Sequence, residues 1–190
     1  MEKLRNSSVW TEEGYRLFAR EGLDGIQVER LARILGLNKS GFYHYFGDLE
    51  GYCGELVLLH KKKVGNFLQE LGETKKLDPD YLHLLIKYSE TVIFQVQLTR
   101  SQNKFFHEAS EWVDQKVDVA IRRLWSEFME VPNDSGGGMR YYAIVRDMFY
   151  TRISFQNFNY TFLHNLVKEV KAIMNEITEI RVLEAGEPHY

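Results

Sequence analysis

The chain has 190 residues, 44% of them hydrophobic and 27% charged, and a formal net charge of −3. This length fits one large or two small domains with a sizeable core. Its single cysteine, Cys53, excludes an internal disulfide framework and a multi-cysteine zinc site. Because the N-terminus lacks an apolar signal core and no stretch approaches the ~20 apolar residues of a membrane helix, we expect a cytoplasmic protein with no membrane partner.

Hydrophobic residues recur at helical spacing along nearly the whole chain, and no hairpin signal is found, which predicts an all-α fold. The expected helices are, in chain order, about 10–21, 28–35, 39–46, 48–71, 81–98, 103–109, 112–129, 139–156 and 160–183. Residues 76–80 are expected to form a loop. The stretch Val131–Gly138 contains one proline and three glycines, and it is predicted to be a flexible linker.

The second and third helices meet the physical requirements of a helix-turn-helix. Ala32 supplies the small residue where the helices cross, and Gly36 tolerates the positive φ of the turn. Leu37 is apolar and is expected to be buried, which would fix the angle between the helices. Asn38 is a good N-cap for a third helix that Phe42 would anchor on its inner face. The pattern therefore predicts an N-terminal DNA-binding unit of three helices.

The residues that carry this pattern are Phe18-x3-Gly22, Val28-x2-Leu31-Ala32-x3-Gly36-Leu37-Asn38-Lys39 and Phe42-Tyr43-His44-Tyr45-Phe46. At these spacings the chain resembles the TetR family of bacterial regulators. The match covers the N-terminal quarter in register, whereas the remainder agrees only in length and helical layout. The resemblance implies a helix-turn-helix DNA-binding domain at 1–47 and a helical ligand-binding and dimerisation domain at 48–190.

The resemblance also implies a mechanism. The last two helices, about 139–183, would form the dimer interface, and the homodimer would place two recognition helices on a near-palindromic double-stranded operator. A small apolar or aromatic ligand in the larger domain would move the fourth helix and release the DNA. The expected function is that of a ligand-responsive transcriptional regulator that acts as a repressor and uses no cofactor.

The resemblance places candidate DNA contacts at the start of the second helix and along the third. The helix N-terminus would attract phosphate, Lys39 would add a point charge, and hydroxyl groups would position the DNA backbone. The residues carried over by position are Gln27, Lys39, Ser40, Gly41, Tyr43, His44 and Tyr45.

Charge is the main departure from this family pattern. Residues 1–50, which we call the head, hold seven Lys/Arg and eight Asp/Glu. Phosphate neutralisation supplies much of the affinity for DNA, so a near-neutral head predicts weak or strongly salt-sensitive binding. The usual Ala-Ala pair is Glu13-Gly14, Glu29 faces a region where a basic residue would help, and Leu49 replaces a common basic residue. The alternative is a helical dimer whose head binds protein or a small ligand instead of DNA.

Aromatic residues in the second half could line an apolar ligand pocket, although core packing is the simpler explanation for each of them. The candidate pocket residues are Phe94, Phe105, Trp125 and Phe149. The six histidines show no metal-ligand spacing, and no phosphate-binding loop or nucleophile motif is found, so neither a metal site nor catalytic residues are expected.

Overall fold

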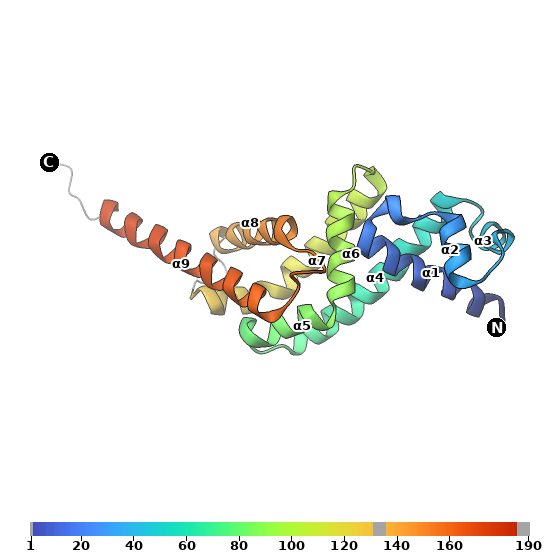
Figure 1. Ribbon diagram of the computed structural model, residues 1–190. Coiled ribbons are helices and arrows are strands. Elements are labelled where there is room, and N and C mark those ends of the chain that lie inside the picture. Colours follow the sequence, from blue (N-terminus) through green and yellow to red (C-terminus); the bar gives the residue numbers. More distant parts are fainter. Residues whose placement is uncertain (1, 131–135, 186–190) are drawn as a thin grey trace. The chain divides into compact units, whose positions relative to one another are not determined.

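The computed structural model describes residues 2–130 and 136–185, with side chains described over 7–130 and 138–176. These residues form helices and connecting turns and contain no strand, which confirms the all-α prediction (Figure 1). The chain divides into two compact units. Unit 1 holds Met1–Glu73 and Lys87–Ala120, and unit 2 holds Thr74–Ile86 and Ile121–Tyr190. The two units are defined by contacts between residues and not by function. The predicted boundary between a DNA-binding domain and a regulatory domain at residue 47 therefore stays a prediction.

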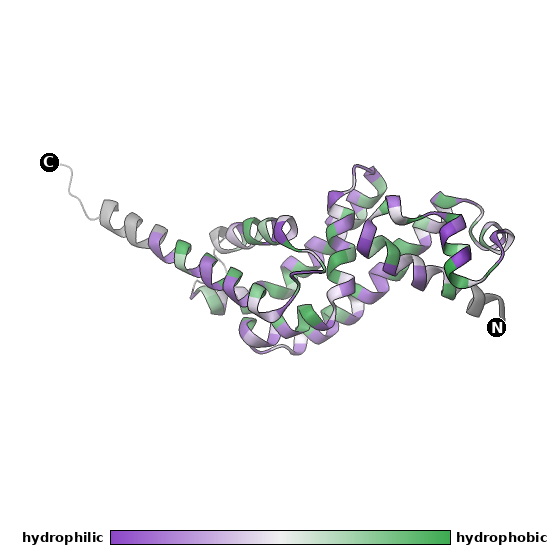
Figure 2. Cartoon of the chain, viewed as in Figure 1, coloured by the Kyte–Doolittle hydropathy of each residue, from purple (hydrophilic) through white to green (hydrophobic). Residues whose placement is uncertain are grey.

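Unit 1 is built from the head and from helices that follow it. Its elements are α1 (Glu2–Glu21), the short 3₁₀ turn η1 (Leu23–Gly25), α2 (Val28–Leu35), α3 (Lys39–Phe46), α4 (Leu49–Glu73), α6 (Ser89–Arg100) and the first part of α7 (Lys104–Met129). Hydrophobic and hydrophilic residues alternate along these helices in the amphipathic pattern (Figure 2). The helix α1 packs against α2, α3, α4 and α6, so it forms the centre of the unit.

Aromatic side chains fill the core of the head. Phe42 is fully buried, and its ring centroid lies 5.6 Å from that of Trp10 and 4.8 Å from that of Tyr52. The Tyr52 hydroxyl donates a hydrogen bond to the carbonyl oxygen of Trp10 at 2.6 Å. A Cβ atom added to Gly14 would lie 1.7 Å from that hydroxyl oxygen. Position 14 therefore requires glycine, because the Tyr52 side chain occupies the space that a side chain at this position would fill.

A chain of buried hydrogen bonds links four helices of unit 1. The Tyr15 hydroxyl donates to Nδ1 of His60 at 2.8 Å, and Nε2 of His60 donates to the amide oxygen of Gln95 at 3.1 Å. The Gln95 amide nitrogen donates to the carbonyl oxygen of Ser110 and to the Asp114 carboxylate. The order of the bonds fixes His60 as the neutral tautomer with its proton on Nε2. Burial lowers the pKa of His60 to about 4, against a smaller opposing effect of Gln95.

Unit 2 contains the π-helical turn η2 (Leu77–Tyr81), α5 (Leu82–Lys87) except its last residue, the second part of α7, α8 (Gly136–Arg152) and α9 (Tyr160–Ala185). The Trp125 indole donates to the carbonyl oxygen of Gly138 at 2.9 Å and so attaches the start of α8 to α7. The Asp78 carboxylate accepts hydrogen bonds from Tyr160 at 2.7 Å and from His164 at 2.6 Å. These bonds attach η2 to α9.

Several predicted boundaries after residue 75 were wrong. Residues 104–129 form the single helix α7, since nothing between Ala109 and Trp112 breaks a helix. The predicted helix at 81–98 is divided at Tyr88, whose φ and ψ are −100° and 25°, and the loop at 76–80 contains η2. Part of the predicted linker, Gly136–Gly138, is the first turn of α8, whereas residues 131–135 lie outside the described part of the chain.

Candidate nucleic-acid interface

The turn between α2 and α3 has the predicted backbone geometry. Gly36 adopts φ 64° and ψ 28°, the left-handed conformation that glycine favours, and its N–H bonds back into α2. The Asn38 side chain accepts a hydrogen bond from the Ser40 N–H at 3.0 Å and caps α3. Leu37 does not lock the helix angle as predicted, because it is 42% exposed. The angle is instead fixed by the buried Ala32 and Phe42.

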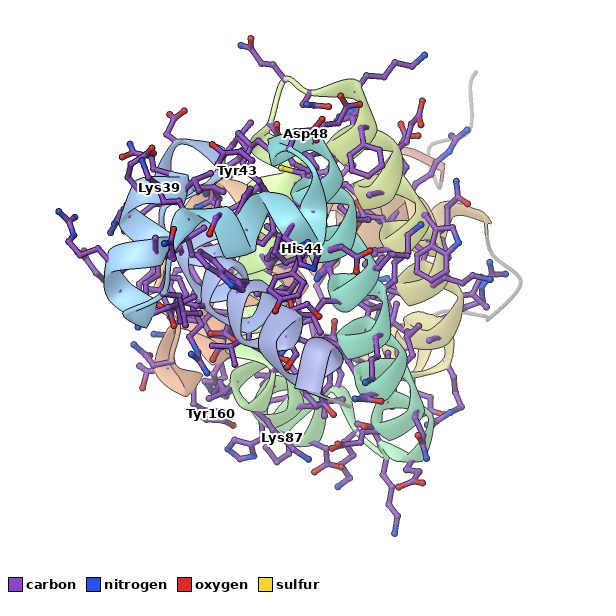
Figure 3. All side chains as sticks on the ribbon, turned by 90° about the vertical axis from the view of Figure 1, so that its right-hand side faces the viewer. Lys39, Tyr43, His44, Asp48, Lys87 and Tyr160 are labelled. Atoms are coloured by element: carbon purple, nitrogen blue, oxygen red, sulfur yellow. The ribbon has the colours of Figure 1, made fainter. Side chains whose placement is uncertain are left out.

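The helix α3 presents polar and aromatic side chains to solvent. Lys39 is its first residue, and Tyr43 and His44 follow one turn later. All three are exposed, and they lie on the part of α3 that faces the viewer in Figure 3. This surface offers a cation, a phenol hydroxyl and an imidazole, which are groups that bind phosphates and base edges.

The other candidate contacts lie beside this surface. Gln27 is the exposed N-cap residue of α2, and its side chain makes no capping hydrogen bond. Ser40 is exposed, whereas Gly41 and Tyr45 are half-buried. The fold thus brings all seven candidates together on α3 and at the start of α2. Their roles as DNA contacts stay a prediction.

Acidic side chains neutralise part of the basic charge of the head. Arg30 makes a two-pronged ion pair with Glu21. The Lys39 ammonium donates to the Glu29 carboxylate at 3.0 Å, across the turn from α3 to α2. This hydrogen bond lowers the pKa of Glu29. No sequence periodicity indicated the pair, because its partners lie ten positions apart on two different helices.

Comparison of the sequence with known protein families identifies this arrangement of helices. Residues 11–51 match the family of bacterial regulatory proteins called the tetR family. The matched segment contains most of α1, all of α2 and α3 and the first residues of α4. This segment is therefore a TetR-type DNA-binding domain, and the chain is similar to the TetR family of transcriptional regulators. No curated protein matched this chain.

The structure explains one departure from the TetR family pattern and locates a second, for which it offers no reason. Gly14 stands in the usual Ala-Ala pair because Tyr52 fills the space beside it. Leu49, at a position that is commonly basic in the TetR family, begins α4 as an exposed apolar residue. The head thus combines the expected backbone with two basic side chains, Arg30 and Lys39, that are held in ion pairs.

The four predicted pocket residues are divided between the two units. Phe94 is fully buried in unit 1, where its ring stacks on that of Tyr15 at 4.1 Å, and Phe105 is exposed on α7. Trp125 and Phe149 are buried in unit 2. Each buried member of the set contacts other side chains of the core, and the ligand-binding role of all four stays a prediction.

Unit 2 contains a cavity of about 280 Å³ near the end of α7. Its lining residues are Lys76, Leu77, Asp78, Leu124, Glu127, Phe128, Glu130 and Lys171. Five of these carry charge, so the cavity suits a polar or ionic small molecule better than an apolar one. Among the described residues, no cluster of His, Cys, Asp and Glu could hold a metal ion, and no helix has the length and apolarity to cross a membrane.

Proposed function

We propose that this protein is a ligand-responsive repressor that binds a near-palindromic DNA operator as a homodimer. The observation that carries the proposal is the exposed face of α3, where Lys39, Tyr43 and His44 lie together inside the matched DNA-binding domain. In this proposal, Gln27 and Ser40 contact phosphate at the two helix starts. The proposal also places this protein in the cytoplasm, where it would have access to DNA.

The proposed DNA contacts divide into two kinds. Lys39 supplies a phosphate contact that is independent of sequence. Tyr43 and His44 can reach base edges, since they lie one turn into a helix that would enter the major groove. Gly41 lets the backbone of α3 approach the DNA closely, and Tyr45 supports the helix from its half-buried position.

Selection from a random duplex library, followed by fluorescence anisotropy on the enriched duplex, tests the proposal. Lys39→Ala is expected to weaken binding by roughly five- to ten-fold and to reduce the salt slope by about one. Lys104→Ala removes the same charge from an exposed site outside the helix-turn-helix and should leave affinity unchanged. If selection enriches no sequence, the DNA-binding proposal fails and the alternative of a head that binds protein or a small ligand is favoured.

The homodimer proposal rests on apolar residues of the last two helices. Ile144 on α8 is 60% exposed, and Ile173 on α9 is also exposed. Covering such side chains by a two-fold related copy would remove apolar surface from water. A dimer also fits a near-palindromic site, because each subunit would read one half.

A charge at the proposed interface should separate the subunits. Ile144→Asp is expected to shift the protein from dimer to monomer, since a carboxylate buried against a symmetric copy of itself is unfavourable. Light scattering after size exclusion measures the mass directly, and Val119→Asp, at another exposed apolar residue, is the control. A wild-type protein that is monomeric at micromolar concentration would contradict the proposal.

The ligand is proposed to bind within the helical domain and to shift the protein toward a conformation with low DNA affinity. The aromatic residues Phe94, Phe105, Trp125 and Phe149 favour an apolar or aromatic ligand. The charged lining of the unit 2 cavity favours a polar one. A thermal-shift screen that contains both chemical classes distinguishes them, because a ligand of the native state raises Tm.

A further inference from the structure

The ion pair between Glu29 and Lys39 joins the two helices that would approach DNA. Glu29 lies in the first turn of α2 and Lys39 is the first residue of α3. Their side chains are 70% and 51% exposed, and the ammonium nitrogen lies 3.0 Å from the carboxylate oxygen. The pair is therefore open to solvent and to any polyanion that reaches this surface.

A DNA phosphate and the Glu29 carboxylate would compete for the same ammonium group. To contact phosphate, Lys39 must leave Glu29, and the released carboxylate then lies beside the negatively charged DNA backbone. Both effects oppose phosphate contact, and the second is screened by salt. The contacts proposed for Tyr43 and His44 do not require Lys39, so they are not opposed in this direct way.

We propose that Glu29 is an internal competitor for Lys39 that weakens the contact of Lys39 with DNA phosphate and thereby lowers the affinity of the head for DNA. This inference rests on the proposed function. Binding to arbitrary sequence depends almost entirely on phosphate contacts, whereas specific binding adds contacts to base edges. The complex with random-sequence DNA therefore reports the competition most directly, because few base contacts accompany its phosphate contacts. Glu29 is in this sense a residue that tunes the affinity of the head for DNA.

A random-sequence duplex of 30 base pairs tests the inference without a known operator. At low salt, Glu29→Gln is expected to bind this duplex roughly three- to ten-fold more tightly than wild type, and the gain should shrink toward one at high salt. The control Glu108→Gln removes the same charge from an exposed ion pair with Lys104 and should give no gain. Thermal melts of each variant verify that the fold is intact.

The double variant shows whether Glu29 acts through Lys39. In a Lys39→Met background only the repulsion between Glu29 and the DNA backbone remains, so Glu29→Gln is expected to give a clearly smaller gain than it gives when Lys39 is present. An equal gain in both backgrounds would overturn the inference, because Glu29 would then simply repel DNA. A Glu29→Gln protein that binds the random duplex no better than wild type, or not at all, would also overturn it. Either result is separate from the failure of library selection, which concerns the proposed function itself.

Discussion

Replacing Phe42 with alanine is expected to destabilise the head by about 3–5 kcal/mol and to abolish specific DNA binding. The Phe42 ring is fully buried and contacts Trp10 on α1, Phe46 on α3 and Tyr52 on α4, with centroid distances of 5.6, 5.1 and 4.8 Å. Its removal leaves a cavity at the point where α3 is attached to the other helices. The exposed face of α3 loses its fixed orientation as a result.

Amide hydrogen exchange locates this effect. Exchange in α3 should accelerate strongly in Phe42→Ala, while the amides of α9 keep their wild-type protection. Phe42→Leu is the matched control, because it keeps most of the buried volume and should cost far less stability. Wild-type protection of α3 in the alanine variant would show that Phe42 does not anchor the recognition helix.

Acid is expected to destabilise unit 1 through His60. Burial lowers the pKa of His60 from 6.5 to about 4, so the unfolded chain binds a proton between these pH values that the native state does not bind. The contribution of neutral His60 to the free energy of unfolding is therefore fully present above pH 6.5 and is lost as the pH falls toward 4. The loss reaches about 3 kcal/mol at pH 4. The buried neighbours Tyr15 and Gln95 accommodate the neutral ring and offer it no negative charge.

The variant His60→Gln isolates this contribution. Glutamine retains hydrogen-bonding groups between Tyr15 and Gln95 but does not titrate. Urea unfolding at pH 7 and at pH 4 should show a smaller acid loss in the variant, by about 3 kcal/mol. Equal losses in the two proteins would show that His60 is protonated as readily in the native state as in the unfolded chain.

Local signals were sufficient to predict the DNA-reading elements. Gly36 at the turn, Asn38 at the N-cap and the apolar Phe42 fix the bounds of α2 and α3 through interactions within a few residues of each other. The seven candidate contacts lie on α3 and at the start of α2, and their roles as DNA contacts stay a prediction. The glycines of Val131–Gly138 were a weaker guide, since Gly136 and Gly137 begin α8.

The sequence by itself determined an all-helical chain with a helix-turn-helix head, because helical periodicity, caps and turn glycines act over short distances. Only the tertiary structure decided the pairing of Lys39 with Glu29, the exposure of Leu37 and the burial of His60 between Tyr15 and Gln95. These features depend on how different helices pack against one another. The spacing of residues along the chain does not indicate which side chains come into contact across helices. The proposed phosphate contact of Lys39 depends on one of these features, because a cation paired with a carboxylate of the same chain must leave it before it can bind phosphate.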